Sequence, residues 1–248
     1  MLALIAAVPM ETELLRQQLF PCEVRECGRR ELLQGRLSGR PVALLHSGVG
    51  KAGAAAATQA LLEKLRPAAV INFGCGGAYP GSGLRVGDLA LANEEVFGDE
   101  GVIAPAGFLD MEQLGFPLLE KGGRRLFNRF PVDGQLLGSA RRLLADFALA
   151  QGCKMAVGPL VTVSSCSGLE RLGWELAERT GGICENMEGA AVAQQCALYD
   201  TPLVALRGIS NLVEDRDMKR WDLKLAARNA QLAVQTLLAH WPLVKETA

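Results

Sequence analysis

Aromatic residues and histidines are scarce in this sequence, and neither sign of charge dominates it. Only 5% of the 248 residues are aromatic, and His46 and His240 are the only two histidines. With so few histidines, and with seven cysteines that form no CxxC pair, no metal site is expected. The formal net charge of −1 gives no bulk electrostatic reason to expect nucleic acid or an anionic membrane as a partner.

The chain also lacks a basic leader and a long apolar run. Its first residues, MLALIAAVPMETELL, are apolar for only about nine positions, too few for a membrane-spanning helix. We therefore expect this segment to form a buried first strand in a cytoplasmic protein. The odd number of cysteines, in apolar settings, predicts reduced thiols and fits the same compartment.

Small and aliphatic residues are abundant instead, and 49% of the sequence is hydrophobic. This composition favours helices packed closely on a sheet, within one domain covering residues 1–248. Apolar runs predict strands near 2–8, 31–36, 41–46, 68–73, 86–92, 156–163, 182–186 and 202–209. Helical spacing predicts helices near 11–20, 54–65, 136–151, 168–179, 187–198 and 221–239. The alternation predicts an α/β three-layer sandwich, with a mixed central sheet and helices on both faces.

Residues 97–133 fit neither periodicity and are rich in Gly, Pro and Phe. A long irregular stretch inside a compact domain is usually functional. We expect this segment to shape part of a binding pocket.

Two glycine-rich segments follow apolar runs. Gly48–Gly53 matches GxGxxG, but the next strand, Val70–Gly74, ends without the carboxylate that a dinucleotide site uses to hold a ribose. The Gly74–Gly77 segment reads as a second turn at a strand end. Each turn alone needs no ligand. Two of them are better explained by one ligand that the backbone approaches closely.

Acidic and amide side chains occur at three further element boundaries. Met10–Glu13 follows the first strand, and Glu185–Glu188 opens a helix of small residues. Acids at such places often only complement the helix dipole. In a sugar site, however, a carboxylate can accept hydrogen bonds from two vicinal hydroxyls, and a neighbouring Met can pack on the ribose. Ser210 and Asn211 end the last strand, where an amide forms a turn or reads the edge of an oxopurine.

In combination, these segments resemble the 5′-methylthioadenosine/S-adenosylhomocysteine nucleosidases and their relatives in the nucleoside phosphorylase superfamily. The matching blocks are Ala7–Glu13, Ser47–Lys51, Ile71–Gly77, Val86–Asp88, Asn186–Glu188 and Arg207–Asn211. Two further regions look like the futalosine hydrolase branch. They are Gly98–Pro117 and Ile209–Asp222.

The resemblance implies a nucleoside-phosphorylase-like enzyme that hydrolyses the N-glycosidic bond of a purine nucleoside, with no cofactor, as a homo-oligomer. In the futalosine branch the products are hypoxanthine and dehypoxanthine futalosine, within menaquinone biosynthesis. By the same resemblance, Glu13 directs the attacking water, Asn211 stabilises the departing base and Glu188 holds the ribose hydroxyls. The other binding residues implied are Gly48, Val49, Cys75, Gly76, Gly77, Asn186, Met187 and Ser210.

Asn211 stands where the methylthioadenosine enzymes have an aspartate. A carboxyl group can bridge N7 and the 6-amino group of adenine, whereas an amide can donate to O6 or N7 of hypoxanthine. The departure favours a 6-oxopurine, and the absence of Arg and Lys from Pro9–Glu13 favours water over phosphate as nucleophile. Two alternatives stay open. One is a nucleosidase acting on methylthioadenosine, S-adenosylhomocysteine or aminodeoxyfutalosine, and the other is a non-catalytic purine-binding protein of this fold.

Overall fold

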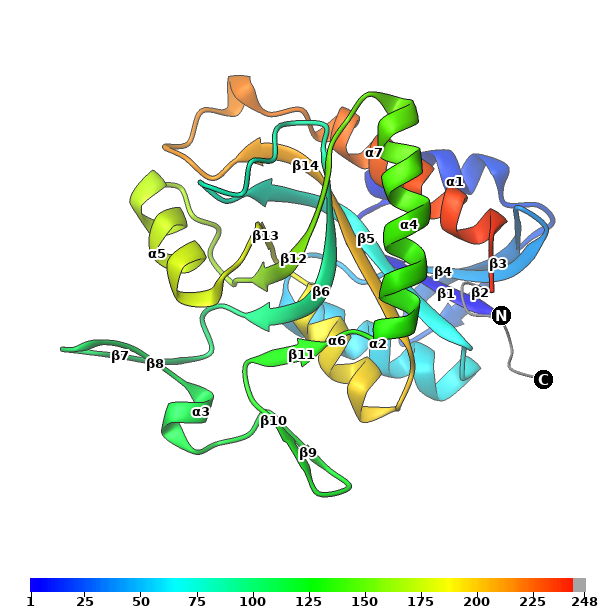
Figure 1. Cartoon of the computed structure of the whole chain (residues 1–248). Coiled ribbons are helices and arrows are strands. Elements are labelled where there is room, and N and C mark those ends of the chain that lie inside the picture. Colours follow the sequence, from blue (N-terminus) through cyan, green and yellow to red (C-terminus); the bar gives the residue numbers. More distant parts are fainter. Residues whose placement is uncertain (243–248) are drawn as a thin grey trace.

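A ten-stranded mixed sheet runs through the molecule, with helices packed on both of its faces (Figure 1). The computed structural model describes residues 1–242. The strands, in sheet order, are β11 (Arg129–Pro131), β6 (Leu89–Phe97), β12 (Met155–Thr162), β13 (Cys184–Asn186), β5 (Ala69–Ala78), β1 (Leu2–Ala6), β4 (Arg40–His46), β3 (Arg30–Leu37) and β2 (Cys22–Cys27). The tenth, β14 (Leu203–Leu212), pairs with both β5 and β6. The predicted fold class is confirmed.

The helices form two layers. On one face lie α2 (Lys51–Leu65) and α6 (Gly189–Leu198), and on the other lie α1 (Glu13–Gln18), α4 (Gly134–Gln151) and α7 (Leu223–Ala239). A sixth packing helix, α5 (Glu170–Thr180), covers the end of β12. None of the helices in residues 1–242 combines the length and apolar character that crossing a membrane requires.

The first strand shows how the two layers share the sheet. All five residues of β1 are buried. Ala3 and Ile5 belong to the core under α2 and α6, whereas Leu4 and Ala6 belong to the core under α1, α4 and α7. A central strand buried on both faces reads as a continuous apolar run, so the sequence is sufficient to predict it.

Two elements differ from the prediction. The edge strand β2 was not expected, because all its residues except Cys27 are exposed and its sequence has no apolar alternation. Gly74–Gly77 was expected to form a turn, but it lies inside β5. There, β14 pairs along one side of β5 and β13 along the other.

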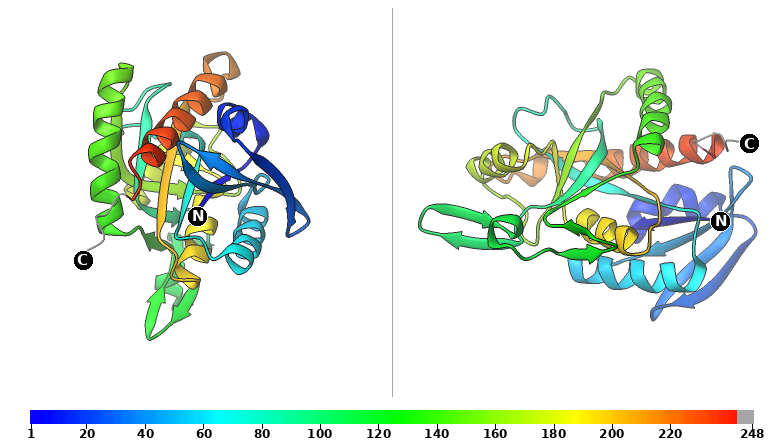
Figure 2. Two further views of the ribbon diagram at one scale, coloured as in Figure 1. Left: turned by 90° about the vertical axis from the view of Figure 1, so that its right-hand side faces the viewer. Right: turned by 60° about the horizontal axis from the view of Figure 1, so that its bottom comes forward.

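Residues 97–133 form two hairpins that project from the sheet (Figures 1 and 2). The elements are β7 (Gly101–Ala104), β8 (Gly107–Asp110), α3 (Met111–Leu114), β9 (Leu119–Lys121) and β10 (Arg124–Leu126). These strands are only three or four residues long. They are too short to show an alternation of apolar and polar residues in the sequence.

Candidate active site

A pocket of about 270 Å³ lies where β1, β5, β13 and β14 come together. It contains all but two of the site residues predicted from the sequence. Those that line it are Val49, Cys75, Gly76, Gly77, Asn186, Met187, Glu188, Ser210 and Asn211. Within the described residues, His, Cys, Asp and Glu side chains do not gather in threes as metal ligands would.

The two residues that do not line the pocket are Glu13 and Gly48. Glu13 is the exposed first residue of α1, and Glu11 lines the pocket in its place. The cause is the short 3-10 helix η1 (Pro9–Thr12). Residues two apart on a helical turn point to different sides, so Glu11 turns inward when Glu13 turns out. Gly48 takes a positive φ of 79° and supports the site with its backbone, donating its N–H to Ala7 O at 3.0 Å.

Backbone amides hold the Glu11 carboxylate in one orientation. Oε2 accepts the N–H groups of Ala7 at 2.9 Å and Val8 at 3.2 Å, and Oε1 accepts the N–H of Cys75 at 2.8 Å. A side chain at Gly74 would overlap this carboxylate. The glycine therefore lets the carboxylate rest directly on β5, with its orientation fixed before any ligand binds.

A second carboxylate, Glu188, enters the pocket from the start of α6. Its Oε1 accepts the N–H of Gly50 at 2.8 Å. Burial raises the pKa of Glu188, the Gly50 N–H and the nearby Arg207 partly offset that rise, and the charge of Glu11 adds to it. Two carboxylates distant in sequence thus face one cavity.

Asn186 fixes the turn that carries Glu188. Its Oδ1 accepts the N–H of Glu188 at 2.9 Å and that of Gly189 at 2.6 Å, as a side-chain cap does at a helix start. The Thr162 hydroxyl donates to the same oxygen at 3.1 Å. Because these protein groups occupy the carbonyl oxygen, Asn186 supports the site more than it offers an acceptor to a ligand.

Asn211 has a fixed amide orientation at the end of β14. The Ser210 hydroxyl donates to Asn211 Oδ1 at 2.8 Å, and Asn211 Nδ2 donates to Leu212 O at 3.0 Å. Ser210 uses one of the two lone pairs of Oδ1, and one N–H of the amide has no acceptor within residues 1–242. The amide is arranged as a hydrogen-bond donor toward the pocket.

A buried polar layer lies beneath the pocket and was not found from the sequence. Arg207 is 2% exposed and donates to Asn72 Oδ1 at 2.6 Å and Leu206 O at 2.8 Å. Glu95 of β6 is fully buried, and its carboxylate lies near Asn186 and Thr162. Burial raises the pKa of Glu95 to about 7, even with the Arg207 charge opposing the rise. The available signal was the polar stretch Asn93–Glu95 between the apolar ends of β6.

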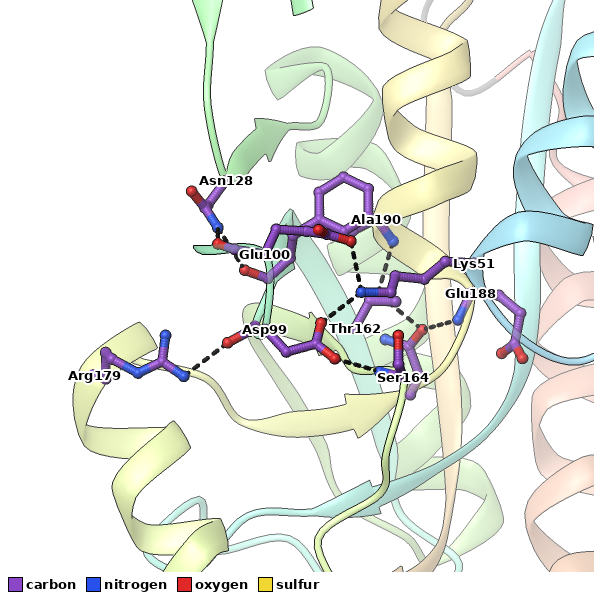
Figure 3. Close-up of polar contacts among 12 residues, drawn as sticks. Lys51, Asp99, Glu100, Asn128, Thr162, Ser164, Arg179, Glu188 and Ala190 are labelled. Carbon is purple, nitrogen blue, oxygen red and sulfur yellow. Dashed lines mark hydrogen bonds and ion pairs between the residues drawn. The ribbon is translucent and has the colours of Figure 1, made fainter. Parts of the chain in front are cut away.

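The segment 97–133 reaches the site only indirectly. Lys51 Nζ lies 2.6 Å from Asp99 Oδ1 and 2.7 Å from Glu100 Oε1, and Asp99 Oδ2 accepts the Ser164 N–H at 2.6 Å (Figure 3). Lys51 follows Gly50, whose amide holds Glu188. The segment contributes no side chain to the pocket lining in the described chain, so the expectation that it shapes this pocket is not met within one subunit.

Comparison with known proteins shows relatives over nearly the whole chain. Residues 1–240 match the family model described as the phosphorylase superfamily. A futalosine hydrolase of Thermus thermophilus is 39% identical over 206 residues, which are 82% of this chain and 84% of that protein. A 5′-methylthioadenosine/S-adenosylhomocysteine nucleosidase of Geobacillus kaustophilus is 31% identical over 250 residues, 96% of each chain. The structure of the corresponding nucleosidase from Neisseria meningitidis, in complex with methylthio-immucillin-A, superposes with a TM-score of 0.82 at 28% identity, over 96% of this chain and 98% of that one.

Proposed function

The chain belongs to the phosphorylase superfamily, and we propose that it is a futalosine hydrolase. It is a purine nucleosidase, and in this proposal it hydrolyses the N-glycosidic bond of futalosine. The products are hypoxanthine and dehypoxanthine futalosine, which places the reaction in menaquinone biosynthesis. The 39% identity to the Thermus thermophilus futalosine hydrolase supports this choice within the family.

The observation that carries the proposal is the orientation of Asn211. With Ser210 bound to Oδ1 and Leu212 O bound to one N–H of the amide, the second N–H is free, within the described chain, to donate to the base. O6 and N7 of hypoxanthine are both acceptors and match this donor. N7 is an acceptor in adenine as well, so the discrimination lies at position 6, where the 6-amino group of adenine would place a donor against a donor, and an unpaired buried polar group is costly.

In the mechanism we propose, Glu11 replaces Glu13 as the residue that orients and deprotonates water. Breaking the glycosidic bond builds positive charge on the ribose and sends negative charge into the purine. Glu11, fixed by its three backbone donors, directs water at C1′. Glu188 holds the 2′- and 3′-hydroxyls with the acceptor capacity that Gly50 leaves, and Asn211 donates to the departing base. Preorganised groups of this kind act where charge develops.

Water suits this pocket better than phosphate as the nucleophile. No Lys or Arg side chain is among the lining residues of the described chain. The nearest buried cation, Arg207, is directed at Asn72 and Leu206. A phosphate ion would lose its hydration without gaining a charged partner.

The proposed assembly is a homo-oligomer. The β7–β8 hairpin exposes Val102 at 46% and Ile103 at 90%, and Phe116 after α3 is 66% exposed. A projecting apolar patch of this kind suits contact with a second copy of the chain. Such a contact would also let the segment 97–133 reach the 5′-group of a substrate.

Methylthioadenosine is the second candidate substrate, favoured by the overall match to the Neisseria meningitidis nucleosidase. The test is to incubate the protein with futalosine, aminodeoxyfutalosine, methylthioadenosine and inosine, with and without phosphate, and to separate the released bases. Fastest release of hypoxanthine from futalosine, independent of phosphate, supports the proposal. Preferred release of adenine supports the second candidate. If no base is released from any of the four, the result supports the alternative of a non-catalytic purine-binding protein.

A further inference from the structure

Glu185 is a buried carboxylate in the pocket that the mechanism above does not use. It is 5% exposed and lines the cavity from β13. Its Oε1 accepts the Ser167 N–H at 2.8 Å, and its Oε2 accepts the Ser167 hydroxyl at 2.6 Å and the Tyr79 hydroxyl at 3.3 Å. The pocket offers this carboxylate no cation among its described lining residues, so an ion pair does not explain it.

The strand register places Glu185 opposite Asn211. Glu185 is paired with Gly77 on one side of β5, and Asn211 is paired with Gly77 on the other. Neighbouring strands lie about 4.8 Å apart, which puts the two backbones roughly 10 Å apart. Gly77 between them carries no side chain, and a Cβ there would come within 3.0 Å of Asn211 Nδ2. The glycine leaves a floor on which a flat base can lie between an amide and a carboxylate.

We propose that Glu185 selects a 6-oxopurine over adenine by accepting a hydrogen bond from N1–H of the base. The inference rests on the proposed function only in placing a purine in this pocket. Hypoxanthine carries a proton on N1, whereas N1 of adenine carries a lone pair. An ionised carboxylate has about four acceptor sites and no proton to give. Ser167 and Tyr79 use three of those sites, which leaves one for the base.

The contact with Ser167 strengthens the discrimination. The Ser167 N–H is a backbone donor at the pocket wall, and such a donor is what N1 of adenine needs. Glu185 occupies it at 2.8 Å. The same carboxylate therefore supplies the acceptor for a 6-oxopurine and removes a donor for adenine. Asn211 reads O6 or N7 of the same base, so two sides of the ring are tested at once.

A purely structural role for Glu185 would be to brace Ser167, and it makes a different prediction. If Glu185 only supported Ser167, its loss would weaken the binding of every base by the same factor. If it accepts N1–H, its loss changes the ratio of the affinities for hypoxanthine and adenine. The affinities of hypoxanthine and adenine are to be measured by calorimetry on the full-length protein at about pH 8, well above the ordinary carboxyl range, because burial raises the pKa of Glu185 while the bonds from Ser167 and Tyr79 oppose the rise. We expect Glu185→Gln to lower the hypoxanthine-to-adenine affinity ratio about tenfold or more, since the new amide can donate to N1 of adenine. Tyr79→Phe, which keeps the carboxylate, should leave the ratio unchanged.

A second measurement needs no variant. The wild-type protein should bind 1-methylhypoxanthine at least about tenfold more weakly than 9-methylhypoxanthine, because only the latter keeps its N1 proton. Equal affinity for the two methylated bases, no binding of hypoxanthine, or an unchanged ratio in a folded Glu185→Gln protein would overturn the proposal. Failure of the futalosine assignment is seen separately, as absence of hypoxanthine release from futalosine by a wild-type protein that still discriminates between the bases.

Discussion

The Glu11 carboxylate accepts the backbone N–H of Cys75 at 2.8 Å, which joins the turn after β1 to the middle of β5. The two bonded residues are more than sixty positions apart in the chain, and the bond links η1, which follows β1, to the neighbouring strand β5. It sets the position of the carboxylate before any substrate arrives. In the proposed mechanism the sheet thereby orients the nucleophilic water, and we expect substitutions at either end of this bond to lower turnover.

Glu11→Gln tests the assignment of the general base directly. An amide can still fill the space, but it cannot take a proton from water. We expect turnover to fall by about 10²-fold or more, with the melting temperature close to that of the wild type. Glu13→Gln is the matched control, because Glu13 is exposed on α1, and it should keep wild-type turnover. The assignment fails if the two variants exchange these behaviours.

Gly74→Ala should lower turnover although residue 74 contacts Glu11 and not the substrate. The added methyl group overlaps the Glu11 carboxylate and must displace it, because β5 is held by strands on both sides. We expect turnover to fall by about tenfold or more, since small misplacements of a reacting group are costly. Gly138→Ala on α4 meets no atom within 4 Å and should be neutral or slightly stabilising. Steady-state kinetics and thermal melting of the two variants separate the effects.

Asn211→Asp should move the preference of the enzyme toward adenine nucleosides. A carboxyl group at the end of β14 can bridge N7 and a 6-amino group, whereas an ionised one repels O6 of hypoxanthine. The ratio of kcat/KM for methylthioadenosine to that for futalosine should rise by about tenfold or more, on the scale of one buried hydrogen bond. The bases released from the two substrates are to be quantified together. An unchanged ratio would remove Asn211 from the recognition of the base.

Glu95 should make stability depend on pH. Because burial raises the pKa of Glu95 from 4.5 to about 7, the folded protein keeps a proton that the unfolded chain releases. Its contribution to stability is complete below pH 4.5 and is lost as pH rises through 7. By linkage the loss is at most about 3 kcal/mol. Urea unfolding at pH 5 and pH 8 should show a larger decline for the wild type than for Glu95→Gln. Parallel declines would show that Glu95 is ionised in both states.

Part of the site could be located from the sequence because it follows from local chemistry. The Asn186–Glu188 segment and the Ser210–Asn211 pair stand at boundaries between apolar runs and polar residues, and the structure brings both to one pocket. Glu185 belongs to the same acidic boundary segment, but the sequence did not show that it lies opposite Asn211, because that depends on the register of β13 and β14 on β5. Its importance comes from what lies opposite it.

The sequence by itself determined the alternation of strands and helices, because burial on both faces leaves an apolar run and amphipathic helices leave a period that can be read residue by residue. The tertiary structure alone decided that Glu11 faces the pocket and Glu13 the solvent, that Gly74–Gly77 continues β5, and that Glu185 and Asn211 flank Gly77. Each of these depends on strand register or on the direction of one short turn. Both are settled by contacts between segments that are distant in the chain, which no local pattern contains.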